Sequence, residues 1–266
     1  MIIIGERINS TRQRVQEAIQ ARNAAFIVKE ASVQAKAGAS YIDVNCAVTS
    51  GDELQDIDWV ISVIQSELPD IGICIDSPNY LAIERALKVY SAKGGVIINS
   101  ITGEDTRIRQ VLPLAIKYDT KLIALTIDEN GMPNSADERF EIARRIYDRV
   151  NREGFRTENL YFDALTRPVS TEPMQAQEFL RSIPMIKKLD DVKTVCGLSN
   201  VSYGLPNRPV INSTFLAMAV QAGLDAAILD PTDKLVVSSI AASRVVLCHD
   251  GYCAEYIKAF REGKLV

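Results

Sequence analysis

The hydrophobic pattern of this chain alternates between two periods. Short apolar runs typical of strands occur at residues 2–4, 41–44, 72–75, 96–98, 122–126, 160–162, 193–198 and 226–229. Helix-length stretches with apolar residues at three- and four-residue spacing lie between or after them, at residues 15–37, 54–67, 80–90, 107–117, 136–153, 176–189, 210–222 and 234–248. Strict alternation of this kind indicates parallel strands, because parallel neighbours need a crossover helix between them.

Eight strand and helix units predict a closed (β/α)8 barrel, the TIM barrel, rather than an open doubly wound sheet. No linker or low-complexity tract interrupts the series, so we expect residues 1–266 to form one domain. Residues 252–260 are expected to form a terminal helix packed outside the barrel. The longest loops, 129–134 and 166–173, both follow strands, where a barrel carries its functional loops.

Polar side chains follow the apolar runs. They are Glu6, Asp43, Asn45, Asp76, Asn99, Thr126, Asp128, Asp163, Asn200 and Asp230. The C-terminal ends of the strands form the active-site rim of this fold, so these side chains are expected to converge there. Asp128 and Asp230 each open a turn before a helix, and we interpret them as caps or loop-stabilising residues. The four residues that end buried runs and are expected to face a shared cavity are Asp76, Asn99, Asp163 and Asn200.

Asn200 is the first candidate for chemistry, because the apolar run that precedes it ends abruptly in small polar residues. No cation stands among the strand-end residues, and without histidine or lysine they are poorly suited to acyl transfer, Schiff-base formation or metal-assisted hydrolysis. They suit a flat neutral heterocycle such as a pterin, whose edge offers two adjacent N–H donors that one carboxylate accepts together. The chain contains neither GxGxxG after the first strand nor GxxxxGK[ST], which argues against dinucleotide and P-loop sites.

The amino-acid composition limits which classes of partner, compartment and metal site the chain can have. With 47% hydrophobic residues, 24% charged residues and a net charge of −4, the chain predicts a globular protein without a nucleic-acid surface. The apolar start is too short for a signal peptide, and no apolar run approaches the roughly 20 residues of a membrane span, so we expect a cytoplasmic protein. The five cysteines are scattered and His249 is the only histidine, so we predict buried thiols and no metal site.

Several motifs in order resemble one family of enzymes. They are GERIN at 5–9, DVN at 43–45, IDS at 75–77, INS at 98–100, FDAL at 162–165, GLSNVS at 197–202 and NRPVINSTFLAMA at 207–219. Together they resemble the methyltetrahydrofolate:corrinoid protein methyltransferases, pterin-binding TIM barrels related to the folate domain of cobalamin-dependent methionine synthase. The resemblance runs from residue 1 to about residue 260. After Asn45 the chain reads Cys46-Ala47, where relatives often have a glycine.

The resemblance implies specific roles. Asp76, Asn99 and Asp163 would hold the pterin ring of tetrahydrofolate or 5-methyltetrahydrofolate, and Asn200 would contact the reactive N5 region as the catalytic residue. The supporting or rim positions implied by the resemblance are Glu6, Asp43, Asn45, Ser199, Ser202 and Arg208.

The implied reaction moves a methyl group between N5 of tetrahydrofolate and the cobalt of cobalamin. The chain lacks the D-x-H-x-x-G pattern with which many corrinoid proteins bind cobalt, so the cobalamin is expected on a separate corrinoid protein that docks transiently at the barrel mouth. Family resemblance also implies a homodimer. The direction stays open: the enzyme either methylates a corrinoid protein, as in acetyl-CoA synthesis, or accepts methyl during breakdown of methylated substrates such as glycine betaine.

Two alternatives remain at this point. One is a dihydropteroate synthase-like pterin enzyme, although that family typically ends its last strand with Arg-x-His and this chain continues with Asp230-Pro231-Thr232. The other is a non-catalytic folate-binding or corrinoid-docking subunit that keeps the barrel. Assay with p-aminobenzoate tests the first, and tight folate binding without methyl transfer would favour the second.

Overall fold

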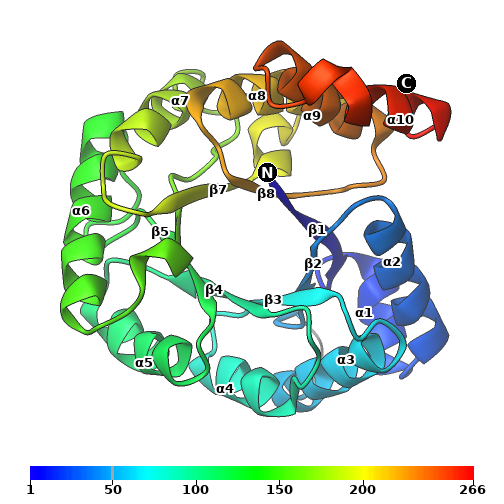
Figure 1. Ribbon diagram of the computed structural model, residues 1–266. Coiled ribbons are helices and arrows are strands. Elements are labelled where there is room, and N and C mark those ends of the chain that lie inside the picture. The colour runs from blue at the N-terminus through cyan, green and yellow to red at the C-terminus, as the bar shows by residue number, and fades with distance from the viewer. Residues whose placement is uncertain (49–50) are drawn as a thin grey trace.

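The computed structural model describes residues 1–48 and 51–266, which form a closed barrel of parallel strands inside a ring of helices (Figure 1). The strands follow one another around the barrel in chain order, and the last strand pairs with the first. They are β1 (Ile2–Asn9), β2 (Tyr41–Asn45), β3 (Gly72–Asp76), β4 (Val96–Ile101), β5 (Lys121–Leu125), β6 (Leu160–Asp163), β7 (Lys193–Gly197) and β8 (Ala226–Leu229). The predicted TIM barrel is confirmed.

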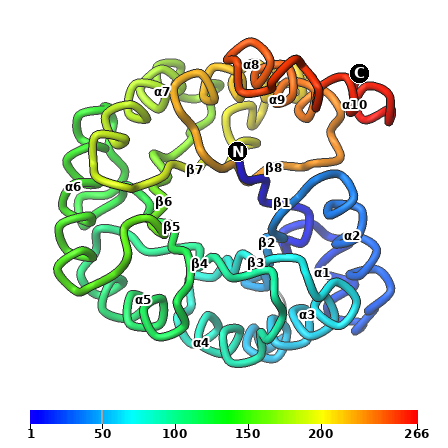
Figure 2. Tube along the Cα trace, viewed as in Figure 1, coloured from blue at the N-terminus to red at the C-terminus, as the bar shows by residue number. Residues whose placement is uncertain are grey.

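Helices connect the strands and cover their outer faces, so the chain winds around the barrel in one direction (Figure 2). They are α1 (Gln13–Gln20), α2 (Ala24–Lys36), α3 (Glu53–Glu67), α4 (Tyr80–Val89), α5 (Asp105–Lys117), α6 (Ala136–Arg152), α7 (Gln175–Ile186), α8 (Arg208–Ala222), α9 (Lys234–Val246) and α10 (Ala254–Arg261). Short 3-10 helices are η1 (Thr157–Asn159), η2 (Leu198–Ser202) and η3 (Gly251–Cys253). The terminal helix lies outside the barrel beside α9, as expected (Figure 1).

The prediction of one helix over residues 15–37 is wrong. Arg22 has a φ of 51°, in the left-handed region, and Asn23 caps the second helix by accepting a hydrogen bond from the backbone N–H of Phe26. A capping side chain followed by a new apolar stripe starts a helix more favourably than it continues one. None of the helices in residues 1–48 and 51–266 is long and apolar enough to cross a membrane.

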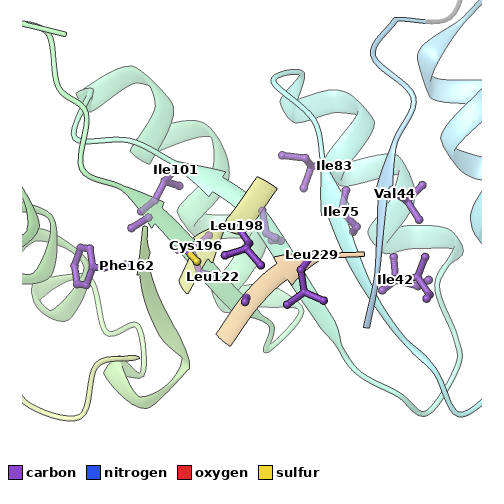
Figure 3. Packing of buried hydrophobic residues seen from close by; sticks show 14 of the residues in the cluster. Ile42, Val44, Ile75, Ile83, Ile101, Leu122, Phe162, Cys196, Leu198 and Leu229 are labelled. Atoms are coloured by element: carbon purple, nitrogen blue, oxygen red, sulfur yellow. The ribbon is translucent and has the colours of Figure 1, made fainter. Parts of the chain in front are cut away.

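Alternating strand residues face two different cores, because successive side chains of a strand point to opposite faces. The outer core lies between strands and helices and includes Ile42, Ile75 and Phe162, which Figure 3 shows from close by. The inner core fills the barrel. Its members are Ile4, Tyr41, Cys74, Ile97, Ile123, Tyr161, Val195 and Ala226. The barrel interior is therefore packed and does not form an open channel.

Two tyrosines and two lysines lie together toward the N-terminal ends of the strands. Lys121 Nζ donates a hydrogen bond to the Tyr41 hydroxyl at 3.0 Å, and it lies 5.5 Å from the centre of that ring. Lys193 lies 5.5 Å from the ring centre of Tyr161 in the same way. The ammonium group of each lysine therefore lies over the face of an aromatic ring. This end of the barrel is filled, so a ligand has to enter from the other end.

Strand β1 continues past the predicted boundary through a bulge. Its pairing with β2 shifts between Gly5 and Ile8, and the Arg7 N–H donates to Gln34 Oε1 at 3.0 Å. A side chain on Gly5 would place its Cβ only 2.4 Å from that same oxygen, so glycine is required for the fully buried Gln34 to approach. Glu6, which we predicted to follow the strand, lies inside it at the bulge. Bulges commonly re-aim side chains at barrel rims.

Candidate functional site

Polar side chains stand two residues after inner-core residues on four strands, toward the C-terminal end of the barrel. Asp43 stands two residues after inner-core Tyr41, Asp163 stands two residues after inner-core Tyr161, and the remaining pairs at this spacing are Cys74 with Asp76 and Ile97 with Asn99. Side chains two apart on a strand share a face, so all four polar residues point into the barrel above the apolar core. We call Asp43, Asp76, Asn99 and Asp163 the polar layer.

Neighbouring strands bring part of the polar layer into direct contact. The Asn45 Nδ2 group donates a hydrogen bond to Asp76 Oδ2 at 2.9 Å, and Asn45 Oδ1 accepts one from the Ser10 hydroxyl at 3.1 Å. Asp76 pairs in register with Asn99 on the next strand. Asn45 therefore orients the Asp76 carboxylate, and it is held in turn by the segment that follows β1.

Asp43 is the most deeply buried carboxylate of the layer, at 3% exposure. Burial raises its pKa well above the usual range, and the nearby charge of Asp76 raises it further, while the Cys74 thiol and Asn99 side chain act in the opposite direction. One of its oxygens, Oδ1, is buried without a hydrogen-bond partner. A buried acceptor without a partner is costly, so this oxygen fits an N–H donor supplied by a ligand.

Asp76 and Asp163 also have raised pKa values. Burial raises the pKa of Asp76 first of all, and the hydrogen bond from Asn45 opposes this shift. Burial raises the pKa of Asp163 from 3.8 to about 6, against the backbone N–H groups of Leu165 and Gly197 and the charge of Arg139. The Leu165 N–H donates to Asp163 Oδ1 at 2.7 Å. Buried carboxylates that receive few hydrogen bonds from the protein are good acceptors for the N–H groups of a ligand.

Asn200 lies beyond the strand end, which corrects the expectation that it ends a buried run. Strand β7 stops at Gly197, and Asn200 sits in the 3-10 helix η2 with an exposed side chain. Its side-chain amide forms no hydrogen bond with any other described residue. A Cβ at Gly197 would lie 3.2 Å from Asn200 Nδ2, so glycine leaves space under the amide. The amide is therefore free to bond a ligand.

A network of side chains holds η2 in place. Ser199 Oγ donates to the Glu6 carboxylate at 2.8 and 3.0 Å, which ties η2 to β1 across the barrel closure. Ser202 Oγ donates to Asn212 Oδ1 at 2.7 Å and accepts from Arg208 Nε at 3.0 Å. These four predicted supporting residues, Glu6, Ser199, Ser202 and Arg208, thus all contact η2 or lie in it. Burial is the largest cause that raises the pKa of Glu6, and the Ser199 bond lowers it.

Cations do reach the C-terminal end of the barrel, although none ends a predicted strand. Arg107 of α5 donates to the carbonyl oxygens of Ser100 and Ser77 at 2.9 and 2.8 Å and lowers the pKa of Asp76. The sequence did not indicate this residue, because an arginine on a helix that bonds backbone carbonyl groups of loops produces no recognisable sequence pattern. It also missed Asn212 as a partner of η2, although Asn212 stands in a recognised motif.

The predicted site residues form two groups. Asp43, Asn45, Asp76 and Asn99 lie together on β2, β3 and β4. Glu6, Ser199, Ser202 and Arg208 lie together around Asn200. Asp163 bonds to neither group through its side chain within the described residues, and its partners are backbone N–H groups, one of which belongs to Gly197 just before η2.

Asp128 and Asp230 stabilise turns, as predicted. Asp128 Oδ1 accepts from the Asn130 N–H at 2.8 Å, and Asp230 Oδ1 accepts from the Thr232 N–H at 3.0 Å. Each carboxylate also has an arginine partner, Arg145 and Arg7 respectively. These contacts explain both residues without a ligand.

Comparisons with known proteins identify the family of this chain. The family model described as pterin binding enzyme matches residues 5–230. The chain is 34% identical, over its full length and 98% of the relative, to the methylcorrinoid:tetrahydrofolate methyltransferase of Eubacterium limosum. It is 30% identical, over 90% of its own length, to the methionine synthase of Mycobacterium tuberculosis, of which it spans only 21%.

A solved structure shows the same fold at low identity. The dihydropteroate synthase of Xanthomonas albilineans, in complex with indole-2-carboxylic acid and 6-chloroguanine, superposes with a TM-score of 0.72 at 15% identity over 92% of each chain. This likeness concerns the fold alone. Taken with the full-length relative, the family match shows that this chain belongs to the pterin-binding enzymes and, within them, to the methylcorrinoid:tetrahydrofolate methyltransferase group.

Proposed function

We propose that this protein transfers a methyl group between a separate corrinoid protein and N5 of tetrahydrofolate. The observation that carries the proposal is the polar layer, where carboxylates stand in the barrel with an unpartnered buried oxygen on Asp43. A pterin edge supplies N–H donors of the kind that this oxygen lacks. The likeness to the Eubacterium limosum enzyme supports the same reaction.

The polar layer binds and orients the pterin ring in this proposal. Asp76 and Asp163 accept N–H donors of the ring, and Asp43 Oδ1 accepts one further donor. Asn99 contributes one amide that both donates and accepts. Asn45 keeps Asp76 oriented through the 2.9 Å hydrogen bond between them. The layer is preorganised, so little of the binding free energy is lost in ordering side chains.

Asn200 acts at N5. Its exposed amide, without another partner, donates a hydrogen bond that strengthens as the bond between N5 and the methyl group forms or breaks. A carboxamide is too weak an acid to give up its proton, so the proton at N5 is exchanged with solvent. Glu6, Ser199, Ser202 and Arg208 do not touch the reacting atoms in this account, and they hold η2 so that Asn200 stays in place.

The corrinoid would supply the cobalt that carries the methyl group, and the residues of this chain bind and orient the folate and stabilise N5 as the methyl group moves. Three successive loops at the C-terminal end of the barrel carry exposed apolar side chains, Met132, Met174 and Tyr203, with exposures of 58%, 59% and 67%. We call these three residues the mouth rim. Exposed apolar side chains around a substrate site support transient docking of a partner protein there.

For the physiological direction we propose methylcorrinoid as donor and tetrahydrofolate as acceptor. The name of the full-length relative states that direction for its own reaction. The same residues serve both directions, because the forward and reverse reactions share one transition state.

We further propose that residues 1–266 act as one cytoplasmic methyltransferase domain and as a homodimer. The end-to-end match with the relative supports the single domain. Exposed apolar side chains on α9 and α10, Val246, Ile257 and Phe260, support an interface on the outside of the barrel, away from the site. Sedimentation analysis of the protein with Phe260→Ser as a comparison tests the dimer.

A spectroscopic assay tests the proposed reaction. The protein is incubated with tetrahydrofolate and methylcobalamin, then separately with methyltetrahydrofolate and Co(I) cobalamin, while the cobalt spectrum is followed. We expect protein-dependent change in both mixtures and formation of the matching folate product. No spectral change in either mixture, with folate bound, would favour a non-catalytic folate-binding subunit instead.

A further inference from the structure

Arg139 is an unusual residue of α6. It is 0% exposed and the largest of the fully buried side chains. No carboxylate among the described residues forms an ion pair with it, and Nη1 is buried without any hydrogen-bond partner. Burying a guanidinium without an anion destabilises the fold, so a residue of this kind at this place calls for another explanation.

The hydrogen bonds of Arg139 join three segments next to the polar layer. Nε donates to the Ala164 carbonyl oxygen at 2.6 Å, and Nη2 donates to Gln175 Oε1 at 2.6 Å. Gln175 Nε2 in turn donates to the Asn134 carbonyl oxygen at 3.0 Å. The guanidinium therefore fixes the backbone after β6 against the start of α7 and the loop before α6.

The fixed segment carries Asp163. Ala164 follows it directly, and Leu165 donates its N–H to the Asp163 carboxylate at 2.7 Å. Arg139 is the cation whose charge favours the ionised form of this carboxylate, which burial disfavours. The Cys196 thiol on β7 also faces Asp163, and its pKa is raised by burial and by the charge of Asp163. The charges around Arg139 itself are those of Arg167, Glu178, Glu138 and Asp163.

We propose that Arg139 is a positioning residue for folate binding: it holds the turn that carries Asp163 and presents a buried positive charge to that carboxylate from outside the barrel. This inference rests on the proposed function, in which ionised Asp163 accepts the N–H donors of the pterin. No described carboxylate forms an ion pair with Arg139, although the charges of Glu178 and Glu138 act on it, so part of its positive charge acts on Asp163.

The test is the pH dependence of tetrahydrofolate binding, measured by calorimetry under anaerobic conditions. For the wild-type protein, affinity is expected to rise with pH through a midpoint near 6, where Asp163 ionises. Arg139→Gln should move the midpoint upward, because the opposite charge is lost. Arg139→Lys, which keeps the charge, should leave the midpoint closer to that of the wild-type protein.

Gln175→Glu provides a second variant that does not remove the guanidinium. It places a carboxylate at the position of the present 2.6 Å hydrogen bond and should neutralise Arg139 in a folded protein. We expect it to raise the midpoint like Arg139→Gln. Arg144→Gln is the matched control on the same helix, since Arg144 is exposed and pairs with Glu141 and Asp148. It should leave the midpoint unchanged.

The outcomes separate this inference from the proposed function. If the wild-type protein does not bind tetrahydrofolate, the proposed function fails. If it binds and both Arg139→Gln and Gln175→Glu leave the midpoint unchanged, or weaken binding equally at all pH values, Arg139 is only structural and the inference is overturned. In an Asp163→Asn background, Arg139→Gln should no longer alter the pH dependence.

Discussion

Replacing Asp163 by asparagine should make the protein more stable while it weakens folate binding. The carboxylate is 9% exposed, and burial raises its pKa from 3.8 to about 6. A shift of that size corresponds to about 3 kcal/mol of free energy spent in keeping the ionised group inside the folded protein. Asparagine has nearly the same shape, its oxygen still accepts from Leu165 N–H, and it carries no charge.

The sign of the pH dependence follows from the raised pKa. The folded protein binds this proton more tightly than the unfolded chain, so ionisation destabilises the fold progressively as pH rises from 3.8 through about 6. The stability gain of Asp163→Asn should therefore be about 3 kcal/mol at about pH 7 and roughly half as large at about pH 5. For a protein of this size the gain at neutral pH corresponds to a rise in Tm of roughly 6 °C.

The assay is thermal and urea unfolding of the unliganded protein across this pH range. Asp128→Asn is a control of opposite sign. Burial would raise the pKa of Asp128, but the bond from Arg145 and other contacts lower it, so this variant should lose stability at neutral pH.

Calorimetry with tetrahydrofolate should show weaker binding to Asp163→Asn by about 1–3 kcal/mol, because one amide oxygen replaces two carboxylate acceptors. A stability gain that is absent at neutral pH, or that does not change with pH, would refute the reasoning.

Two further outcomes are expected. Asp76→Asn should also weaken folate binding by about 1–3 kcal/mol, because the new NH2 group would face N–H donors of the pterin and of Asn45. Calorimetry showing wild-type affinity would contradict the assignment of Asp76 to the pterin edge. Replacing Met132, Met174 and Tyr203 by serine should slow methyl transfer with the corrinoid protein severalfold while free methylcobalamin reacts as before, and equal slowing with both substrates would count against docking at the mouth rim.

The barrel was predictable because each strand and helix repeats its own hydrophobic period. Errors arose where one side chain decides the local backbone. The first helix ends at Gln20, Arg22 takes a left-handed backbone conformation and Asn23 caps the next helix, although the apolar spacing on both sides continues. Strand β1 extends through Glu6 because Gln34 satisfies the bulged N–H of Arg7, and that contact crosses 27 positions of sequence. Such long-range contacts leave no mark on a local pattern.

The candidate site was predictable in part for the same reason. Asp43, Asp76 and Asp163 follow apolar strand residues, and the strand period fixes the direction in which they point. The position of Asn200 in a 3-10 helix could not be read from the run before it, because Leu198 continues the apolar pattern after the strand has ended. Arg139 did leave a signal: it stands three and four positions before Ile142 and Ala143, on the buried stripe of α6.

The most direct test of the central claim compares methyl transfer by the wild-type protein and Asn200→Ala at saturating tetrahydrofolate. The polar layer is proposed to bind the ring, and Asn200 to contact N5 in the transition state. Asn200→Ala should therefore transfer methyl on the order of 10²-fold more slowly or worse, even when calorimetry shows that folate is bound, with a smaller loss of affinity. A variant that reaches the wild-type rate once folate is saturating would contradict this assignment.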